Sequence, residues 1–387
     1  MDNEIDIAYP YTSRRKKETG NSASLSLVAA FVFMSKSLFA LVLAGGSGER
    51  FWPLSRRARP KQLLKLVSEK TLLEETIDRL DGVVPRERIL ILTNVDQEKA
   101  VRELLLDLPA ENIVAEPAKR DTAAAVALAT AWVARRDHQA TMAVLPADHV
   151  IKNRAAFQET LRIAARAAEE TGAMVTIGVK PTWACPGFGY IERGAPVSLK
   201  DAENVFRVVR FREKPNAELA DRFVRDGNFR WNAGMFVWSV PTVLSEFNRH
   251  APALADFISQ IRAPNNWDCA LRDRFSKLPR ISFDYAIMEK ADRVLMVEAS
   301  FDWDDVGGWR AVASYLEQDA KGNAANTDLT TLDASSNIVF SDTPTKVALV
   351  GVQNLIIVRT GDALLICNRH DAEKIKNVVA DLPPELQ

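Results

Sequence analysis

The feature that most constrains this 387-residue chain is the apolar run Leu38–Leu43, which leads almost at once into the glycine-rich loop Gly45–Gly48. Further runs rich in β-branched and aliphatic residues follow, and helical patterns lie between them. Such alternation predicts a mostly parallel sheet covered by helices on both faces. In sheets of this kind ligands bind beyond the C-terminal ends of the strands, so we expect the chemistry to lie on the loops that follow them.

The length suggests two domains, at roughly 100–200 residues per domain, with room for a sizeable core. The first domain is expected to be α/β. Its expected strands are Leu38–Leu43, Ile89–Leu92, Met142–Leu145 and Met174–Gly178, and its expected helices include Leu72–Leu80, Gln97–Leu106, Thr122–Arg136 and Ala155–Glu170.

The sequence changes character after Leu316. Short apolar clusters recur there at a spacing of roughly 8–12 residues, which suggests a small all-β unit of coiled or solenoid-like shape. A polar-faced segment, Asp371–Leu382, is expected to close this unit as a helix. Because the clusters carry few residue types suited to catalysis, we expect a structural or assembly role. The clusters are Ile338–Phe340, Val347–Val352, Leu355–Val358 and Leu364–Ile366.

Residues 1–33 differ from the rest of the chain. Four basic residues, Arg14–Lys17, precede the apolar stretch Leu25–Phe33, an order that resembles the front of a signal peptide. A bilayer span needs about 20 apolar residues, and this stretch is shorter. Because a strand begins just after Met34, we expect residues 1–33 to be a disordered extension or the product of an upstream start codon, with Met34 as the working start and a targeting role as the alternative. The expected domains are then 34–318, catalytic, and 319–387, β-helix-like with a C-terminal helix.

Composition excludes several classes of protein. With 50 Lys and Arg against 51 Asp and Glu, the formal net charge is −1, which argues against a protein whose main function is to grip nucleic acid. Cys185, Cys269 and Cys367 lie far apart, and the sequence has no Cys-x-x-Cys pair. Neither a disulfide framework nor a structural zinc site is therefore expected. These features favour a reducing, cytoplasmic setting, and we expect no nucleic-acid or membrane partner.

The loop after the first strand carries the strongest local signal. Its three glycines within Gly45–Gly48 allow the backbone to approach a ligand closely and to point N–H groups at an anion. No Gly-Lys-Ser/Thr closes it as in a P-loop, and Phe51 stands where a dinucleotide fingerprint has its third glycine. Arg50 supplies a bidentate cation suited to phosphate oxygens, and Lys61 adds a second cation. The combination predicts a triphosphate-binding loop; a plain strand-turn with solvated cations is the alternative.

The segment from Gly45 to Leu54, followed by Pro60 and Lys61, resembles the opening motif of the sugar-1-phosphate nucleotidyltransferases. Later motifs resemble the mannose-1-phosphate guanylyltransferase branch of that family. They follow the expected order, and the resemblance runs from Ser37 to the C-terminus. These motifs are Glu116-Pro117, Arg120–Ala123, Leu145–His149, Glu213–Pro215, Trp231–Phe236, Phe283–Lys290 and Phe301–Gly307.

The resemblance implies a Rossmann-like α/β domain with a mixed, mostly parallel sheet, followed by a small left-handed β-helix-like domain through which a homodimer could form. It implies that mannose 1-phosphate attacks the α-phosphorus of GTP in line, giving GDP-mannose and pyrophosphate with the help of Mg²⁺ or another divalent cation. Two alternatives stay open. One is a sister enzyme with a different base or hexose, and the other is a non-catalytic regulator that binds nucleotide sugars.

Positioning and charge neutralisation dominate such a reaction, and a divalent cation there needs one or two protein carboxylates. Asp148 directly follows an expected strand, and Asp305 follows another apolar run. The resemblance makes these two residues the metal ligands. Asp302 and Asp304 crowd the same loop as Asp305, and only the motif register selects Asp305. For the other two, solvation, helix capping or support of the site are the alternatives.

The resemblance also implies roles for the remaining motif residues. Asp284 is an equal candidate for capping the helix after it, and Asp121 or Thr122 for capping the helix Thr122–Arg136. The implied catalytic residues are Arg50, Lys61 and Lys214; the nucleotide-binding residues are Gly45, Gly46, Gly48, Arg50, Arg120 and Thr122; the sugar-phosphate-binding residues are Gly189, Glu213, Lys214, Asn232 and Asp284.

Overall fold

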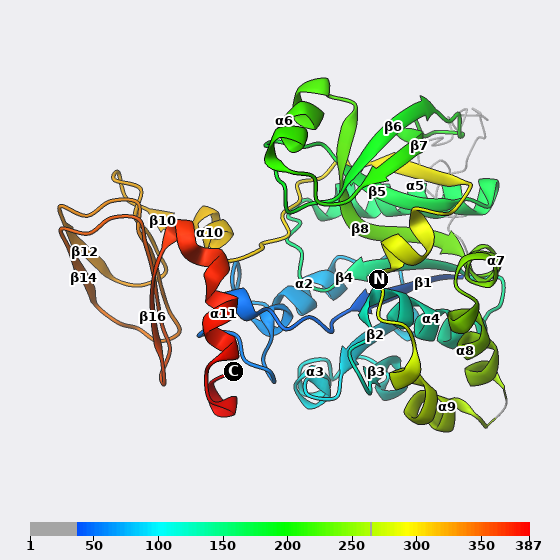
Figure 1. Ribbon diagram of the computed structural model, residues 1–387, viewed down its shortest axis with the longest axis horizontal. Helices are drawn as coiled ribbons and strands as arrows, with labels where there is room; N and C mark the ends of the chain where they lie inside the picture. Colours follow the sequence, from blue (N-terminus) through cyan, green and yellow to red (C-terminus); the bar gives the residue numbers. More distant parts are fainter. Residues whose placement is uncertain (1–36, 264) are drawn as a thin grey trace, which may run out of the picture. The chain divides into compact units, whose positions relative to one another are not determined.

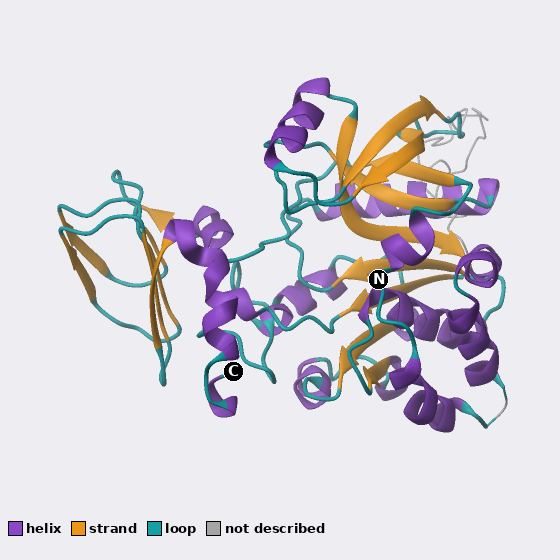
Figure 2. Ribbon diagram, viewed as in Figure 1, coloured by secondary structure: helices purple, strands orange, loops and turns teal. Residues whose placement is uncertain are grey.

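The computed structural model describes residues 37–263 and 265–387 (Figure 1). The expectations for residues 1–33 lie outside the described residues. Strands and helices alternate through the first part of the described chain, and short strands dominate the last part (Figure 2). Among the described residues, no helix is long and apolar enough to cross a membrane.

The first part is built on one large sheet. Within the described residues, β7 and β8 run opposite to the other seven strands, so the predicted mixed, mostly parallel sheet is confirmed. In spatial order the strands are β3 (Ile113–Glu116), β2 (Ile89–Asn94), β1 (Leu38–Leu43), β4 (Thr141–Pro146), β8 (Phe229–Ser239), β5 (Met174–Val179), β9 (Val294–Glu298), β7 (Val205–Arg212) and β6 (Tyr190–Pro196).

Helices pack against this sheet. The Ala-rich α4 contacts β1, β2 and β4 and also α7 and α8, and its small side chains let it be buried on almost every side. The amphipathic α5 contacts β4, β5, β8 and β9. The helices are α2 (Leu72–Asp78), α3 (Glu98–Leu104), α4 (Asp121–Ala134), α5 (Arg154–Thr171), α6 (Ala217–Asp226), α7 (Val240–His250), α8 (Pro252–Arg262), α9 (Trp267–Arg274) and α10 (Trp309–Val312).

The last part of the chain coils into two small sheets. Strands β11, β13 and β15 stack in parallel in one sheet, and β12 and β14 pair in parallel in the other, as in a β-helix. Asn337 Nδ2 donates to Asn323 Oδ1 at 2.8 Å, which links successive coils. The strands are β10 (Glu317–Gln318), β11 (Ala324–Ala325), β12 (Leu329–Leu332), β13 (Ile338–Ser341), β14 (Val347–Val350), β15 (Leu355–Arg359) and β16 (Leu364–Asn368).

The predicted closing helix over Asp371–Leu382 is present, but it is divided into two parts and ends earlier, at Ala380. The segment is a 3₁₀ helix over Arg369–Lys374, then α11 (Ile375–Ala380). Its buried side chains are Ala372, Ile375 and Val379. The first two are three residues apart, which suits a 3₁₀ turn, and the next is four residues on, which suits an α turn.

The coiled part shares a hydrophobic core with the loop that follows β1. Phe51, Trp52 and Trp309 belong to one buried cluster with Phe340 and Val379. The indole of Trp309 donates to the carbonyl of Trp52 at 3.1 Å. The glycine-rich loop is therefore held against the C-terminal part of the chain by apolar packing. The division between residues 318 and 319 stays a proposal.

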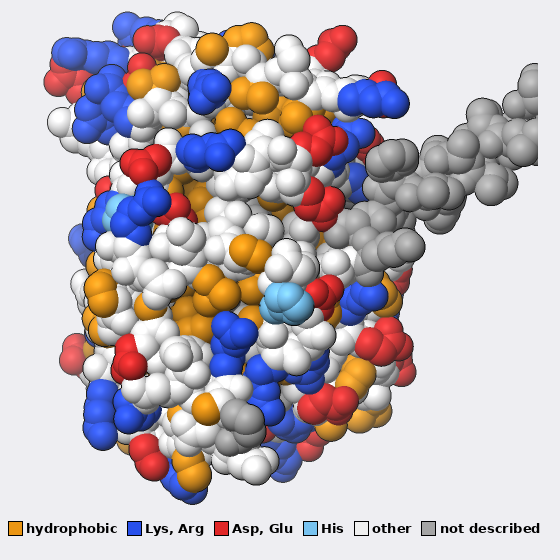
Figure 3. Space-filling view, turned by 90° about the vertical axis from the view of Figure 1, so that its right-hand side faces the viewer, with side chains coloured by type: hydrophobic (Ala, Val, Ile, Leu, Met, Phe, Trp, Pro, Cys, Tyr) orange, Lys and Arg blue, Asp and Glu red, His pale blue; other side chains and the backbone are white. Residues whose placement is uncertain are grey.

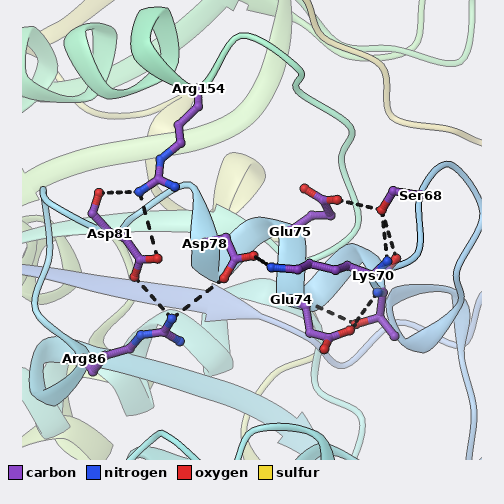
Figure 4. Close-up of polar contacts among 9 residues, drawn as sticks. Ser68, Lys70, Glu74, Glu75, Asp78, Asp81, Arg86 and Arg154 are labelled. Carbon is purple, nitrogen blue, oxygen red and sulfur yellow. Dashed lines mark hydrogen bonds and ion pairs between the residues drawn. The ribbon is translucent and has the colours of Figure 1, made fainter.

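An ion-pair network fixes α2 beside the start of α5 (Figure 4). Arg86 lies 3.8 Å from an oxygen of Asp78 and 3.2 Å from an oxygen of Asp81. Arg154 donates to the carbonyl of Asp81 at 2.7 Å, and Lys70 pairs with Asp78. At the end of α2, Arg79 donates to the carbonyl of His149 at 3.1 Å, so the network holds a helix that contacts the loop after β4.

Charges of both signs are interspersed over the face that carries α7, α8 and α9 (Figure 3). Apolar side chains gather between them near the middle of that face. Positive and negative side chains therefore lie next to one another on this face and do not form separate patches of one sign.

Candidate active site

A cavity of about 710 Å³ opens at the C-terminal ends of the parallel strands β1 to β4, where such sheets bind ligands. A second cavity of about 350 Å³ adjoins the first, and Asp148 and Asp305 line both. The first is lined by Gly45, Gly46, Arg120, Thr122, Gly189, Glu213, Asn232 and Asp284, and the second by Gly48, Arg50 and Lys61.

Lys214 lines neither cavity. Its side chain is 68% exposed and its ammonium lies 3.4 Å from an oxygen of Glu213. Its backbone has a φ of +43°, which is uncommon for a residue with a side chain. The structure thus brings together the predicted site residues other than this lysine.

The glycine-rich loop is fixed by an amide that sequence reasoning gave no role. Gln62 Nε2 donates to the carbonyl of Ala44 at 2.7 Å and to that of Gly46 at 3.2 Å. Gln97 Nε2 donates to the same Gly46 carbonyl at 3.1 Å. Because these hydrogen bonds occupy the backbone carbonyls, they stabilise the observed conformation of the loop. The position of Gln62, directly after Lys61, is the signal that could have pointed to it.

Lys61 contacts both predicted metal ligands, one through its carboxylate and the other through its backbone. Its ammonium donates to Asp148 Oδ2 at 2.8 Å and to the backbone carbonyl of Asp305. Burial acts to raise the pKa of Asp148, but the charge of Lys61 outweighs it with the help of hydrogen bonds and holds that pKa below its usual value. Burial raises the pKa of Asp305 to about 6, and the charges of Asp304 and Asp148 act in the same direction. A negative charge on Asp305 is therefore less well compensated than one on Asp148.

The other two acids on that loop have structural partners. Asp302 accepts the backbone N–H groups of Lys152 and Asn153 at 2.9 and 2.8 Å. Asp304 accepts the backbone N–H of Val306 at 2.7 Å and the hydroxyl of Tyr315 at 2.9 Å. Their carboxylates thus brace the loop, which leaves Asp305 as the acid of this loop that lines the cavities.

Four side-chain positions form the wall opposite the glycine-rich loop. Asn232 Nδ2 donates to Asp284 Oδ1 at 2.8 Å, and both residues line the cavity. Asp284 does not cap the π-helix Asp284–Met288, because Phe283 stands at its N-cap position. Burial raises the pKa of Asp284, and Glu213 adds to the rise. A Cβ at Gly189 would lie 2.5 Å from a carboxylate oxygen of Glu213. The glycine therefore makes room for that carboxylate beside the cavity.

The two residues predicted to read the nucleotide make backbone contacts. The guanidinium of Arg120 donates to the carbonyl of Ser276 at 2.7 Å through Nε, and Thr122 Oγ1 accepts the backbone N–H of Phe283 at 2.8 Å. Both residues still line the cavity. Among the described residues no side chain caps α4, although Asp121 Oδ1 accepts the N–H of Thr122 at 3.0 Å.

Glu116 is a cavity residue without a predicted role. It ends β3, and within the described residues its buried Oε1 has no hydrogen-bond partner. Burial raises its pKa to about 8, with a further contribution from Asp121. Its place before Pro117, at the C-terminal end of a strand, is the signal that marks it.

Aromatic rings line the cavity near Asp148. Phe188 and Trp303 lie on its wall with their ring centroids 5.3 Å apart. The indole of Trp303 donates to His149 Nδ1 at 3.1 Å. Burial lowers the pKa of His149 to about 4, so the imidazole is neutral at pH 7 and packs rather than carries charge. Scattered aromatics in the sequence gave no signal of this wall, because loops far apart in the chain assemble it.

Family models match both parts of the chain. The nucleotidyl transferase model matches residues 39–322. The model described as a MannoseP isomerase/GMP-like beta-helix domain matches residues 328–382.

Known proteins resemble most of the chain. A mannose-1-phosphate guanylyltransferase of Escherichia coli is 36% identical over 348 residues, 88% of this chain and 73% of the relative. The alginate biosynthesis protein AlgA of Pseudomonas aeruginosa is 36% identical over 353 residues, 89% of this chain and 72% of the relative. A crystal structure described as mannose-1-phosphate geranyltransferase from Thermus thermophilus is 36% identical, with a TM-score of 0.80 over 89% of this chain and 99% of that one. The chain therefore belongs to the nucleotidyl transferase family, among the mannose-1-phosphate guanylyltransferases.

Proposed function

We propose that this chain transfers the guanylyl group of GTP to mannose 1-phosphate, giving GDP-mannose and pyrophosphate in the cytoplasm. The observation that supports this most strongly is the 36% identity, over 88% of the chain, to a relative that carries this name. The cavity walls agree with the reaction, because they combine cations for phosphates, two carboxylates for a metal and polar groups for a sugar.

In this reaction an oxygen of the sugar phosphate forms a bond to the α-phosphorus of GTP, and the bond from the α-phosphorus to the bridging oxygen breaks as pyrophosphate leaves. Positioning and charge neutralisation supply most of the catalysis. Lys61 is 7% exposed and its ammonium makes two hydrogen bonds, so its side chain is already fixed beside Asp148 before a substrate binds. Arg50, on the opening loop, would neutralise the phosphates that leave.

A divalent cation fits beside Asp148 and Asp305. Both carboxylates line both cavities. Burial is the main cause of the raised pKa of Asp305, the charges of Asp304 and Asp148 add to it, and a cation would stabilise the ionised form. No group of three or more His, Cys, Asp or Glu side chains among the described residues is arranged to hold a metal. Mg²⁺ does not need one, because one or two carboxylates complete its shell together with substrate phosphates and water. When bound, the cation would neutralise charge on the triphosphate.

The sugar side of the cavity would bind mannose through hydrogen bonds. The amide of Asn232 can donate and accept, and the carboxylates of Glu213 and Asp284 can accept from hydroxyl groups. Lys214, which lines neither cavity, would reach the sugar phosphate only by a change of its exposed side chain. Arg120 and Thr122 would contact base or ribose from the opposite end.

A homodimer through the C-terminal domain is part of the proposal. Strand β16 lies at the edge of its sheet, and its side chains Leu364 and Ile366 are 57% and 62% exposed. Exposed apolar side chains on an edge strand favour pairing with another chain. Light scattering behind a sizing column measures the mass in solution, and a monomer at micromolar concentration would contradict this part.

The test of the reaction is pyrophosphate release, measured with each of GTP, ATP, UTP and dTTP against mannose 1-phosphate and glucose 1-phosphate. We expect the largest kcat/KM for GTP with mannose 1-phosphate. Release with UTP or dTTP but not GTP would refute the guanylyl assignment. No release with any pair would refute enzymatic activity.

A further inference from the structure

The phosphate end of the site contains a cation from the C-terminal domain. Lys376, on α11, lines the 350 Å³ cavity together with Arg50 and Lys61. It also lines a neighbouring cavity of about 480 Å³ that includes Lys119, and the two cavities share Ser47 of the glycine-rich loop. Lys376 therefore lies where the loop and the C-terminal domain meet.

This position is held firmly by the surrounding structure. Ile375 and Val379, on either side of Lys376, are 2% and 7% exposed and belong to the core that contains Phe51 and Trp52 of the loop. The indole of Trp52 also donates to the carbonyl of Leu386 at 2.8 Å. The backbone that carries Lys376 is thus packed against the backbone that would cradle the phosphates.

The three cations of this cavity differ in whether an acidic side chain of the chain already neutralises their charge. Lys61 is bonded to Asp148, and Arg50 Nε lies 2.8 Å from a carboxylate oxygen of Glu373. Among residues 37–263 and 265–387, Lys376 forms no ion pair, whereas the neighbouring Lys374 pairs with Asp371 at 2.7 Å. Lys376 is therefore the cation of this cavity whose charge is left for a ligand.

A ligand bound in this cavity would take the place of the Glu373 carboxylate beside Arg50. Both side chains are exposed, at 44% and 71%, and exposed ion pairs of this kind are weak. A carboxylate next to Arg50 stands where an oxygen of an anionic ligand could bind. Polyphosphate oxygens make stronger charge-assisted hydrogen bonds to a guanidinium and can displace it.

We propose that Lys376 binds the β- and γ-phosphates of the nucleotide, the part that leaves as pyrophosphate, so that the C-terminal domain completes the phosphate site. This rests on the proposed nucleotidyl transfer. It does not depend on the base or the sugar, because every such transfer releases pyrophosphate. Lys376 lines the phosphate cavity but not the cavity that would hold the sugar, so its effect is confined to the nucleotide tail.

The test compares Lys376→Met with Lys374→Met in the full-length chain. Lys374 lies two residues away and lines neither cavity, so its substitution controls for the loss of one surface charge. Lost charge-assisted hydrogen bonds should raise the KM for GTP and, in the reverse reaction, the KM for Mg²⁺-pyrophosphate by about tenfold in Lys376→Met. The KM for mannose 1-phosphate should change less than about twofold, and Lys376→Arg should restore most of the pyrophosphate affinity.

An unchanged KM for Mg²⁺-pyrophosphate in Lys376→Met would overturn the proposal, as would an equal rise in Lys374→Met. Thermal unfolding of each variant separates a loss of binding from a loss of structure. If the wild-type chain used another nucleotide or sugar, the pyrophosphate comparison would still decide the role of Lys376. If the wild type were inactive with all pairs, titration with Mg²⁺-pyrophosphate by calorimetry would decide it, and equal affinity in both variants would refute it.

Discussion

Replacing Gly48 with alanine tests whether the glycine-rich loop positions Lys61. Gly48 has a φ of +64°, and a Cβ there would lie 2.5 Å from the Cβ of Lys61 and 2.6 Å from its backbone nitrogen. The first distance is about 0.9 Å short of the 3.4 Å at which ordinary contact begins, and the second atom belongs to backbone and cannot rotate away. Lys61 must therefore shift, together with the ammonium that holds Asp148 and Asp305.

Two costs add in this variant. The left-handed backbone costs an alanine about 1–2 kcal/mol, and the displacement of Lys61 costs more. Gly172→Ala is the matched control, because Gly172 has a φ of +63° but no described atom within 4 Å of the added Cβ. We expect the control to lose about 1 kcal/mol of unfolding free energy and to keep its kcat. Gly48→Ala should lose more, and its kcat should fall by about 100-fold, since a misplacement of about 1 Å can cost that much.

Equilibrium denaturation in urea measures the first quantity, and pyrophosphate release from GTP and mannose 1-phosphate measures the second. The reasoning is refuted if Gly48→Ala keeps the kcat of the wild type, or if it is no less stable than Gly172→Ala. A fall in kcat with unchanged stability relative to the control would mean that Lys61 relaxes easily, and that the loop matters for phosphate contacts alone.

Four further variants test other contacts of the site. Asp148→Asn should lower pyrophosphate release by at least about 100-fold while the circular dichroism spectrum stays unchanged. Asp302→Asn should mainly lower the melting temperature, because Asp302 accepts two backbone N–H groups. The reverse pattern would contradict the metal assignment. Burial and Asp121 raise the pKa of Glu116 from 4.5 to about 8, so the native state binds a proton more tightly than the unfolded state and stability is lost as the pH rises from 4.5 through 8. Glu116→Gln should therefore melt at a higher temperature than the wild type at pH 8 but not at pH 4. An equal difference in melting temperature at the two pH values would contradict this assignment. Glu373→Gln should lower the KM for GTP by no more than about fivefold, because an exposed pair is worth about 1 kcal/mol or less, and a raised KM would show that the carboxylate assists binding.

Local patterns predicted the strands that frame the site. The expected strand Leu38–Leu43 coincides with β1, and the expected Met142–Leu145 lies within β4 (Thr141–Pro146). These strands are buried except at their last residue, so a nearly unbroken apolar run marks them. Because the strands are parallel, the polar residues that follow them had to meet at one edge of the sheet. That is why the cavity collects residues named from sequence.

Contacts between distant segments could not be predicted in this way. The hydroxyl of Thr122 binds the backbone of Phe283, and no local pattern connects two residues so far apart. The same holds for Arg50 and Glu373, which approach because the C-terminal segment packs on the loop. Sequence patterns show which face of an element is buried but not which distant element covers it. Side-chain partners at the site depend on that missing information.

The hydrophobic core shared with the loop after β1 gives the C-terminal domain a role beyond the one expected from its sequence. Strand spacing marks a boundary near residue 318, yet Phe51 and Trp309 on one side are 1% and 0% exposed because they pack with Phe340 and Val379 on the other. The boundary between the two folds is therefore not a boundary between two independently stable parts. Apolar burial contributes about 25 cal/mol per Å², so the stability of both domains depends on this contact. Phe51 follows Arg50 directly, so the same contact that stabilises the C-terminal domain fixes the backbone of the phosphate loop. The domain expected to serve a structural or assembly role therefore also stabilises the glycine-rich loop, through the core that the two share.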